Sequence, residues 1–195
     1  MKSQSTRREF LALGGRAAGV SALALNLPLI LATGRAAAEA ADAGAAFEHL
    51  SPAEARVLAA IADQVFPPDE QPGASDLGAV YFMDGALGGF MGGALPMIQA
   101  GCSGLNEASM QSAGVGFADL GFEQQTALLE QREDSAFFGT AHFLTLAGIF
   151  SAPAYGGNRD RLGWTMLGFE PRHAWQPPFG DYDARDHAEA DHEPD

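Results

Sequence analysis

The residues of this chain that could do chemistry are spread out rather than grouped. The five histidines, His49, His142, His173, His187 and His192, show no metal-ligand spacing with a cysteine or with a second histidine. There is no Cys-x-x-Cys-His motif for covalent haem and no Gly-x-Ser-x-Gly turn of a serine hydrolase. Gly114-Val115-Gly116 lacks the third glycine and the flanking strand of a phosphate-binding loop. The sequence therefore predicts no catalytic, cofactor-binding or metal site in this chain.

Individual titratable side chains have plain structural interpretations. His142 lies in an apolar stretch, which favours a core or interface histidine over a catalytic base. Asp63, Asp84 and Glu130 have no carboxylate partner in view, so we expect them to be solvated surface groups. Cys102 cannot form a disulfide within the chain, so it is either buried and inert or bonded to another chain. Residue statistics favour burial, and both alternatives stay open.

His187 and His192 lie five residues apart among carboxylates near the C-terminus. Weak metal binding is the alternative there to a solvated tail. We favour the tail, because a disordered segment offers no preformed geometry for a metal.

One polar segment stands out, Tyr155-Gly156-Gly157-Asn158-Arg159-Asp160. Paired glycines permit a tight backbone path, and asparagine tolerates the left-handed conformation. The Arg159 guanidinium can bind a carboxylate or backbone carbonyls. One interpretation is a rigid loop that docks a partner, with Trp164 and Phe169 as aromatic anchors. The other is an ordinary turn closed by Asp160, and the sequence alone does not choose between them.

The elements that must position this segment are predicted to be helices. Ser51 and Glu54 form a capping box around Pro52, and apolar residues at helical spacing follow as far as Pro67-Pro68. Asp76 is expected to cap a second helix that runs to about Ala86.

Glycine is frequent in residues 85–116, and each internal glycine costs a helix about 1 kcal/mol relative to alanine. We therefore expect two short helices there, within 95–101 and within 105–112. A further helix is predicted over 123–132. Its expected inward residues are Ala127, Leu128 and Gln131.

Ser135 is expected to cap a helix from Ala136 to about Phe150. This helix, which contains Phe138 and Phe143, is apolar nearly all round, so it should be buried in the core or against a partner. Period-two alternation and β-branched residues are both rare. The predicted fold class is all-α, with long irregular loops and an irregular C-terminal extension that packs on a partner.

The N-terminal segment has the order of a twin-arginine export signal. Arg7 and Arg8 precede Phe10 and Leu11, and a moderately apolar stretch follows over 17–32. This route carries folded proteins across a membrane, so it predicts a periplasmic protein. Export of a folded chain usually means that a cofactor, or a partner holding one, was loaded beforehand.

Small residues mark the end of the signal. The predicted cut lies after Ala38, with Ala36 as the other member of the small pair, and a cut after Ala40 or an uncleaved anchor are the alternatives. The predicted divisions are a signal peptide at 1–38, a helical domain at 39–180 and an acidic disordered tail at 181–195.

Charge excludes one class of partner. The chain has 11 basic and 25 acidic residues, and residues 1–38 hold five of the basic and one of the acidic ones. The remainder therefore carries a formal charge of −18. Such a chain would repel phosphates, so we expect no nucleic-acid binding.

The chain resembles a known family, the small subunit (subunit 3, or gamma) of gluconate 2-dehydrogenase-type flavoprotein dehydrogenases. Four features carry the resemblance across residues 7–170. They are the twin-arginine signal, Leu50-Ser51-Pro52 leading to Ile61-Ala62-Asp63 and Phe66-Pro67, the loop Pro72-Gly73-Ala74, and the run Phe150 to Asp160 into Gly163-Trp164 and Gly168-Phe169.

The resemblance implies a division of labour. A large GMC-type flavoprotein binds FAD and oxidises a sugar or polyol, and a multihaem cytochrome c subunit, where present, passes electrons to quinone. The small subunit stabilises the flavoprotein and supplies the export signal for the twin-arginine translocase. In some members a small-subunit cysteine bonds the flavoprotein, which would be Cys102 here. The expected interface residues are Phe138, Phe143, Phe150, Tyr155, Gly156, Gly157, Asn158, Arg159, Asp160, Trp164 and Phe169.

Two rivals to this interpretation remain. One is an envelope binding or structural protein without a redox role. The other is an independent periplasmic enzyme, for which the sequence offers no acid, base or metal cluster.

Overall fold

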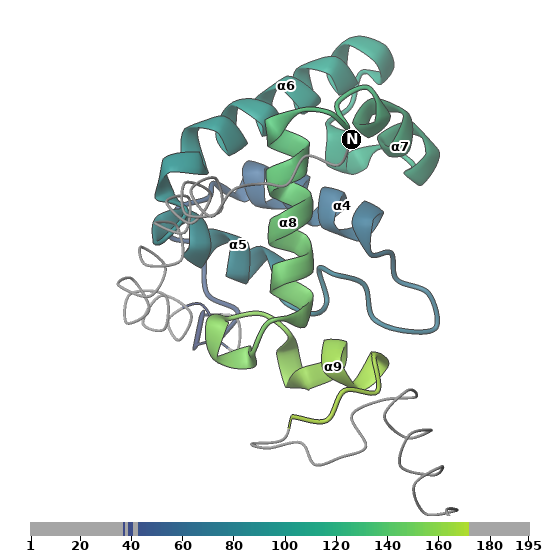
Figure 1. The fold of residues 1–195 in the computed structure, drawn as a ribbon. Coiled ribbons are helices and arrows are strands. Elements are labelled where there is room, and N and C mark those ends of the chain that lie inside the picture. The colour runs from purple at the N-terminus through teal and green to yellow at the C-terminus, as the bar shows by residue number, and fades with distance from the viewer. Residues whose placement is uncertain (1–36, 38, 41–42, 172–195) are drawn as a thin grey trace, which may run out of the picture. The chain divides into compact units, whose positions relative to one another are not determined.

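The computed structural model describes residues 37, 39–40 and 43–171 (Figure 1). Residues 52–166 contain six α-helices: α4 (Pro52–Val65), α5 (Ala79–Gly88), α6 (Leu95–Ala113), α7 (Phe122–Glu130), α8 (Ala136–Phe150) and α9 (Leu162–Met166). Short 3-10 turns join them: η2 (Gly92–Ala94), η3 (Phe117–Asp119), η4 (Pro153–Tyr155) and η5 (Arg159–Arg161). The described residues contain no strand, so the predicted all-α class is confirmed.

Helix α4 begins as predicted. The Ser51 hydroxyl accepts a hydrogen bond from the Glu54 N–H at 3.3 Å, and the Glu54 carboxylate accepts one from the Ser51 N–H at 2.8 Å. The helix ends at Val65, just before the two prolines that cannot donate a continuing bond. Its inner face is fully buried at Leu58 and Ile61, so α4 is a central element of the core.

The predicted cap of α5 was wrong. Asp76 does not cap the helix; its carboxylate accepts a hydrogen bond from the Gly73 N–H at 3.2 Å and so closes the preceding turn. Helix α5 begins at Ala79, after Gly78 with φ of 82°. The chain reverses through a left-handed residue here, which glycine adopts without steric cost.

The glycine-rich middle forms one helix rather than two, so that prediction was also wrong. Gly101 lies inside α6, and a Cβ there would sit 2.0 Å from the Phe137 ring of α8. The missing side chain lets Phe137 pack directly on the α6 backbone, and this contact offsets the low helix propensity of glycine. The buried side of α6 is continuous along the helix: Ile98, Cys102, Leu105 and Ser109.

Helix α7 buries a different face from the one predicted. Ala127 and Gln131 are exposed, whereas Gln125 and Leu129 are buried. The Gln125 side-chain amide donates hydrogen bonds to the backbone carbonyls of Phe117 at 3.1 Å and Leu120 at 3.2 Å. A buried polar residue therefore sets the orientation of α7, which apolar periodicity could not indicate.

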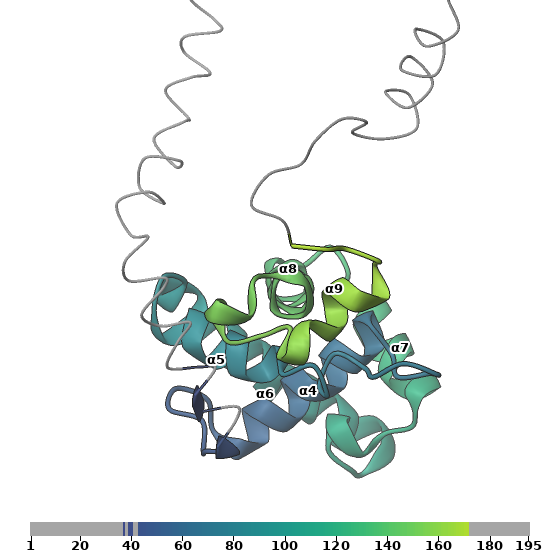
Figure 2. The same cartoon turned by 90° about the horizontal axis from the view of Figure 1, so that it is seen from below.

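Helix α8 has the predicted bounds and the predicted cap, since the Ser135 hydroxyl accepts from the Phe138 N–H at 3.1 Å. It packs across α5 and α4 (Figure 1) and is seen almost end-on in Figure 2. Gly148 permits the close approach to α5, because a Cβ there would lie 3.0 Å from Ala79 Cα. One side of α8 therefore completes the core.

The chain divides into two compact units at Gly163 and Trp164. Helices α4 to α8 and the turns up to Gly163 form the first unit. In the described part of the second, the Trp164 and Phe169 rings meet edge to face at 5.3 Å, and the Phe169 N–H donates to the Trp164 carbonyl at 2.8 Å.

Candidate partner-binding surface

The turn that follows α8 is fastened to the inside of its own unit. A Cβ on Gly157 would lie 1.9 Å from the Gly148 carbonyl oxygen, and a Cβ on Gly163 would lie 1.9 Å from the Ile149 carbonyl oxygen. Backbone therefore touches backbone at both places, and only glycine fits. The Asn158 N–H donates to the Gly148 carbonyl at 2.6 Å. The turn is thus tied to the last turn of α8.

Asn158 is the centre of this turn and has no exposed surface. Its side-chain amide donates to the Ser151 carbonyl at 2.9 Å, and its side-chain oxygen accepts from the Gly163 N–H at 2.9 Å. The neighbouring Arg159 N–H donates to the Leu77 carbonyl at 3.1 Å, just before α5. One buried side chain thus satisfies backbone groups at both ends of the turn.

The backbone here is strained at three residues that are not glycine. Asn158, Asp160 and Arg161 have φ of 48°, 55° and 61°. Left-handed residues other than glycine cost on the order of 1–3 kcal/mol each, although asparagine and aspartate tolerate the conformation best. The surrounding hydrogen bonds and the buried asparagine hold this conformation in place.

The predicted interface residues of the turn differ in accessibility. Gly156, Gly157 and Asn158 are buried in the chain's own contacts, so their direct role is to shape the turn. Tyr155 and Arg159 are half-buried and Asp160 is exposed. The part of the predicted docking loop that reaches the surface is therefore its rim.

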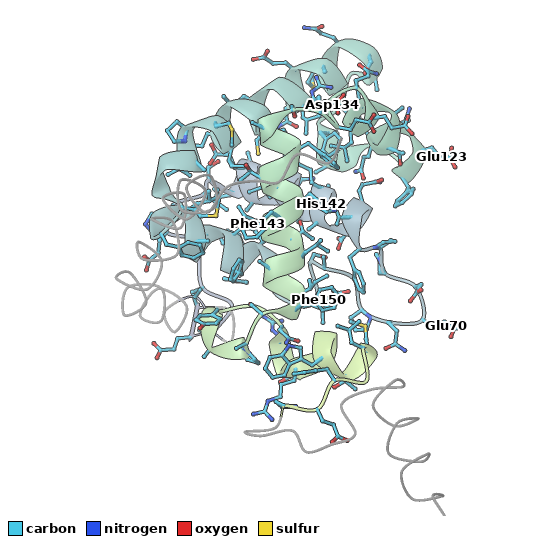
Figure 3. All side chains as sticks on the ribbon, in the orientation of Figure 1. Glu70, Glu123, Asp134, His142, Phe143 and Phe150 are labelled. Carbon is cyan, nitrogen blue, oxygen red and sulfur yellow. The ribbon has the colours of Figure 1, made fainter. Side chains whose placement is uncertain are left out.

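The side of α8 that faces away from the core is apolar and open. We call Gly139, Phe143, Leu146, Ala147 and Phe150 the outer face of α8; Phe143 and Phe150 are labelled in Figure 3. Phe143 is 55% exposed, whereas Phe150 is half-buried and meets the Phe66 ring edge to face at 6.0 Å. An exposed phenylalanine on so apolar a helix is typical of a surface that another element covers.

Phe138 and His142 lie beside this face. Their rings are 6.1 Å apart, and both line a cavity of about 300 Å³ shared with α4 and α7. His142 is exposed, which excludes the core and leaves the interface as the other expected position. A role at an interface stays a prediction for both residues.

A comparison with protein families identifies the chain. The model of the family described as gluconate 2-dehydrogenase subunit 3 matches residues 52–171, which is 120 of the 195 residues. The chain belongs to the gluconate 2-dehydrogenase subunit 3 family. The matched region starts at the first residue of α4 and ends with the described part of the chain. No curated protein and no solved structure matches the chain.

This subunit 3 chain contains buried carboxylates that the sequence interpretation missed. Asp84 is 7% exposed and accepts hydrogen bonds from the N–H groups of Glu48, His49 and Leu50 at 2.8–3.0 Å. It thereby fastens the segment before α4 to α5, and it is not a solvated group. A lone aspartate within the apolar α5 was the available signal, because a buried carboxylate needs donors.

Asp63 was also wrongly expected to be solvated. It is half-buried, and its carboxylate accepts from the Ser75 N–H at 2.9 Å and the Ser75 hydroxyl at 2.7 Å. Glu130 is exposed, as expected. Asp84 and Asp63 therefore stabilise loops of the subunit.

Cys102 of this subunit is 1% exposed on the inner side of α6. Burial, with a smaller contribution from the nearby Glu54 carboxylate, raises the pKa of its thiol to about 12. In this conformation the side chain is out of reach of another chain. The disulfide that the family resemblance implies stays a prediction, and it would require α6 to move.

Two further kinds of site in the described part of the chain would be a metal centre and a membrane-spanning helix. There, no group of three or more histidine, cysteine or carboxylate side chains could hold a metal ion. Among the helices of residues 52–166, none combines the length and the apolar character needed to cross a bilayer. The predicted export residues Arg7, Arg8, Phe10 and Leu11 and the cleavage residues Ala36 and Ala38 lie outside the described residues, as does the tail at 181–195.

Proposed function

We propose that this chain is the non-catalytic small subunit that binds, stabilises and co-exports an FAD-dependent dehydrogenase of the GMC type. The observation that carries the proposal is Phe143, 55% exposed on the apolar outer face of α8, in a chain whose family is a dehydrogenase subunit. The family name already implies a complex with a catalytic gluconate dehydrogenase subunit.

The outer face of α8 supplies the contact. Covering the exposed part of Phe143 removes roughly half of a phenylalanine surface from water, which contributes about 2–3 kcal/mol at 25 cal/mol per Å². Aromatic anchors of this kind dominate interface energies when a rim excludes water around them. The exposed rim of the 155–160 turn supplies polar neighbours through Arg159 and Asp160.

The cofactor then resides in the partner. The flavoprotein holds FAD and oxidises a sugar or polyol, and a multihaem cytochrome c, where the complex has one, takes the electrons. This chain contributes the twin-arginine signal, with Arg7 and Arg8 addressing the translocase, and the complex crosses to the periplasm folded. This division of labour explains why an export route for loaded proteins is joined to a chain whose sequence offers no cofactor motif.

Co-purification tests the proposal. A C-terminal tag on this chain is used to isolate its native complex, and both the co-eluting masses and the flavin absorbance are recorded. We expect a yellow complex with one large partner. A colourless chain that elutes alone would contradict the proposal and favour an envelope protein without a redox role.

A matched pair of variants locates the interface. Phe143→Asp is expected to lose the yellow partner, because a carboxylate would have to be buried without a donor. Phe122 is 56% exposed at the start of α7, so Phe122→Asp changes the same amount of surface elsewhere. The control should keep the partner; equal retention by both variants would place the interface away from α8.

A further inference from the structure

A second apolar surface is formed by residues from the N-terminal half of the chain, between Ala46 and Tyr81. A groove of about 580 Å³ opens between the segment before α4, α4 itself and α5. Its walls include Phe47, Leu50, Pro52, Ala59, Val80 and Tyr81, and no α8 residue lines it. Clefts of this size and character hold several apolar side chains. This groove is therefore a separate surface from the outer face of α8.

The groove is held open by specific contacts. The Phe47 and Tyr81 rings lie 4.8 Å apart, and the Tyr81 hydroxyl donates to the Ala45 carbonyl at 3.1 Å. Asp84 fixes the next three backbone N–H groups of the same wall. Among the described residues that line the groove, Arg56 is the one charged side chain, and it pairs with Asp119. It is a preformed apolar site whose wall runs directly into the N-terminal segment.

That segment has a matching composition. Leucine occupies every second position at Leu23, Leu25, Leu27, Leu29 and Leu31. An extended backbone places alternate side chains on one face, and proline at position 28 favours extended backbone at its own position and the one before. Residues 10–38 contain no acidic side chain, so nothing charged would be buried except at the ends.

The connection is long enough for this segment to fold back. Leu31 lies fourteen positions before Ala45, where the wall of the groove is anchored. At about 3.5 Å per residue they reach on the order of 50 Å. A short tether of this kind gives an effective concentration in the millimolar range, so a modest affinity is enough to fill the groove.

We propose that the leucine segment 23–31 docks into this groove of its own chain before export. The purpose assigned to the docking, sheltering the apolar part of the signal until the translocase takes it, rests on the proposed export function. The docking itself does not, because it involves only this chain.

Cysteine labelling of the full chain tests the docking. The chain carrying Ala59→Cys is purified from the cytosol of a host without the twin-arginine translocase and treated with a maleimide. We expect Cys labelling at position 59 to be at least tenfold slower than in the same chain with Leu25→Asp, Leu27→Asp and Leu29→Asp. The native Cys102 contributes no background, because it is 1% exposed.

Controls separate docking from other causes. Gln111→Cys, at the exposed end of α6, should label at the same rate with and without the aspartates. Equal rates at position 59 in both chains overturn the proposal. Protection that rises with protein concentration also overturns it, since a second copy would then be the occupant. Loss of the flavoprotein in co-purification would leave these rates unchanged, so the two proposals fail separately.

Discussion

The turn after α8 and the outer face of α8 are adjacent in sequence and opposite in character. The turn has the side chains that invite a functional interpretation, yet Asn158 is fully buried, and its side chain hydrogen-bonds to the backbone of Ser151 and Gly163. The outer face has no distinctive motif, yet Phe143 is 55% exposed. In this subunit the polar motif holds the fold together and the plain apolar helix offers the surface. A distinctive motif is therefore no guide to which residues reach the surface.

Gly157→Ala tests most strongly whether the turn after α8 is a structural element. Its Cβ would lie 1.9 Å from the Gly148 carbonyl oxygen, and neither backbone can move without disturbing α8 or α5. We expect the free energy of unfolding to fall by about 3 kcal/mol. Chemical denaturation followed by circular dichroism measures it.

Gly139→Ala is the matched control on the outer face. Nothing lies within 4 Å of a Cβ at that position, so this change should stabilise the chain by about 0.5–1 kcal/mol through helix propensity. If the two glycines responded alike, the turn would not be packed as the structure has it.

Asn158→Ala is expected to cost about 2 kcal/mol, because it leaves the Gly163 N–H and the Ser151 carbonyl without their buried partner. Asn158→Asp keeps the acceptor but loses the donor and buries a charge, so it should be at least as harmful at pH 7. The exposed Asp160→Asn serves as control and should change stability by less than 0.5 kcal/mol. A partner-binding loss in Asn158→Ala without a stability loss would return this residue to the interface.

Local signals in the sequence predicted the helices whose ends are set by neighbours. The Ser51 capping box, the prolines after α4 and the Ser135 cap all act within four residues, so the bounds of α4 and α8 could be derived. The all-α class followed from the same kind of signal.

The predictions for α6, α7 and Asp84 were wrong because these features depend on contacts between residues far apart in the sequence. Gly101 argues against a helix until Phe137, 36 residues away, is seen to fill its place. The orientation of α7 depends on Gln125 reaching the carbonyls of η3, and Asp84 meets donors more than 30 residues earlier. The spacing of residues along one helix does not indicate partners that lie on other elements. The exposure of Phe143 was equally invisible, because an apolar helix is consistent with a core and with an interface.

Cys102, buried on the inner side of α6, makes the stability of the subunit depend on pH. Its folded pKa of about 12 lies above the ordinary 9.0, so the folded state retains a proton that the unfolded state loses. This contribution to stability is complete below pH 9 and is lost as the pH rises towards 12, by at most about 1.4 kcal/mol per pH unit.

Urea unfolding at several pH values, compared between the native chain and Cys102→Ala, measures this loss. The slope between pH 9 and 12 should be smaller in the variant. Thiol labelling of the native chain near pH 8 should be no faster than its unfolding. Rapid labelling would show that α6 opens, and would support the predicted disulfide between Cys102 and another subunit.

Phe143→Asp is the variant that decides what the outer face is for. Because this side chain is 55% exposed, less than half of its surface packs within the subunit, so we expect the free energy of unfolding of the isolated chain to fall by about 1–2 kcal/mol. Loss of the flavoprotein together with a fall of only this size would separate binding from folding. A fall in stability as large as that of Gly157→Ala would instead make Phe143 part of the core, and the contrast between the two regions would disappear.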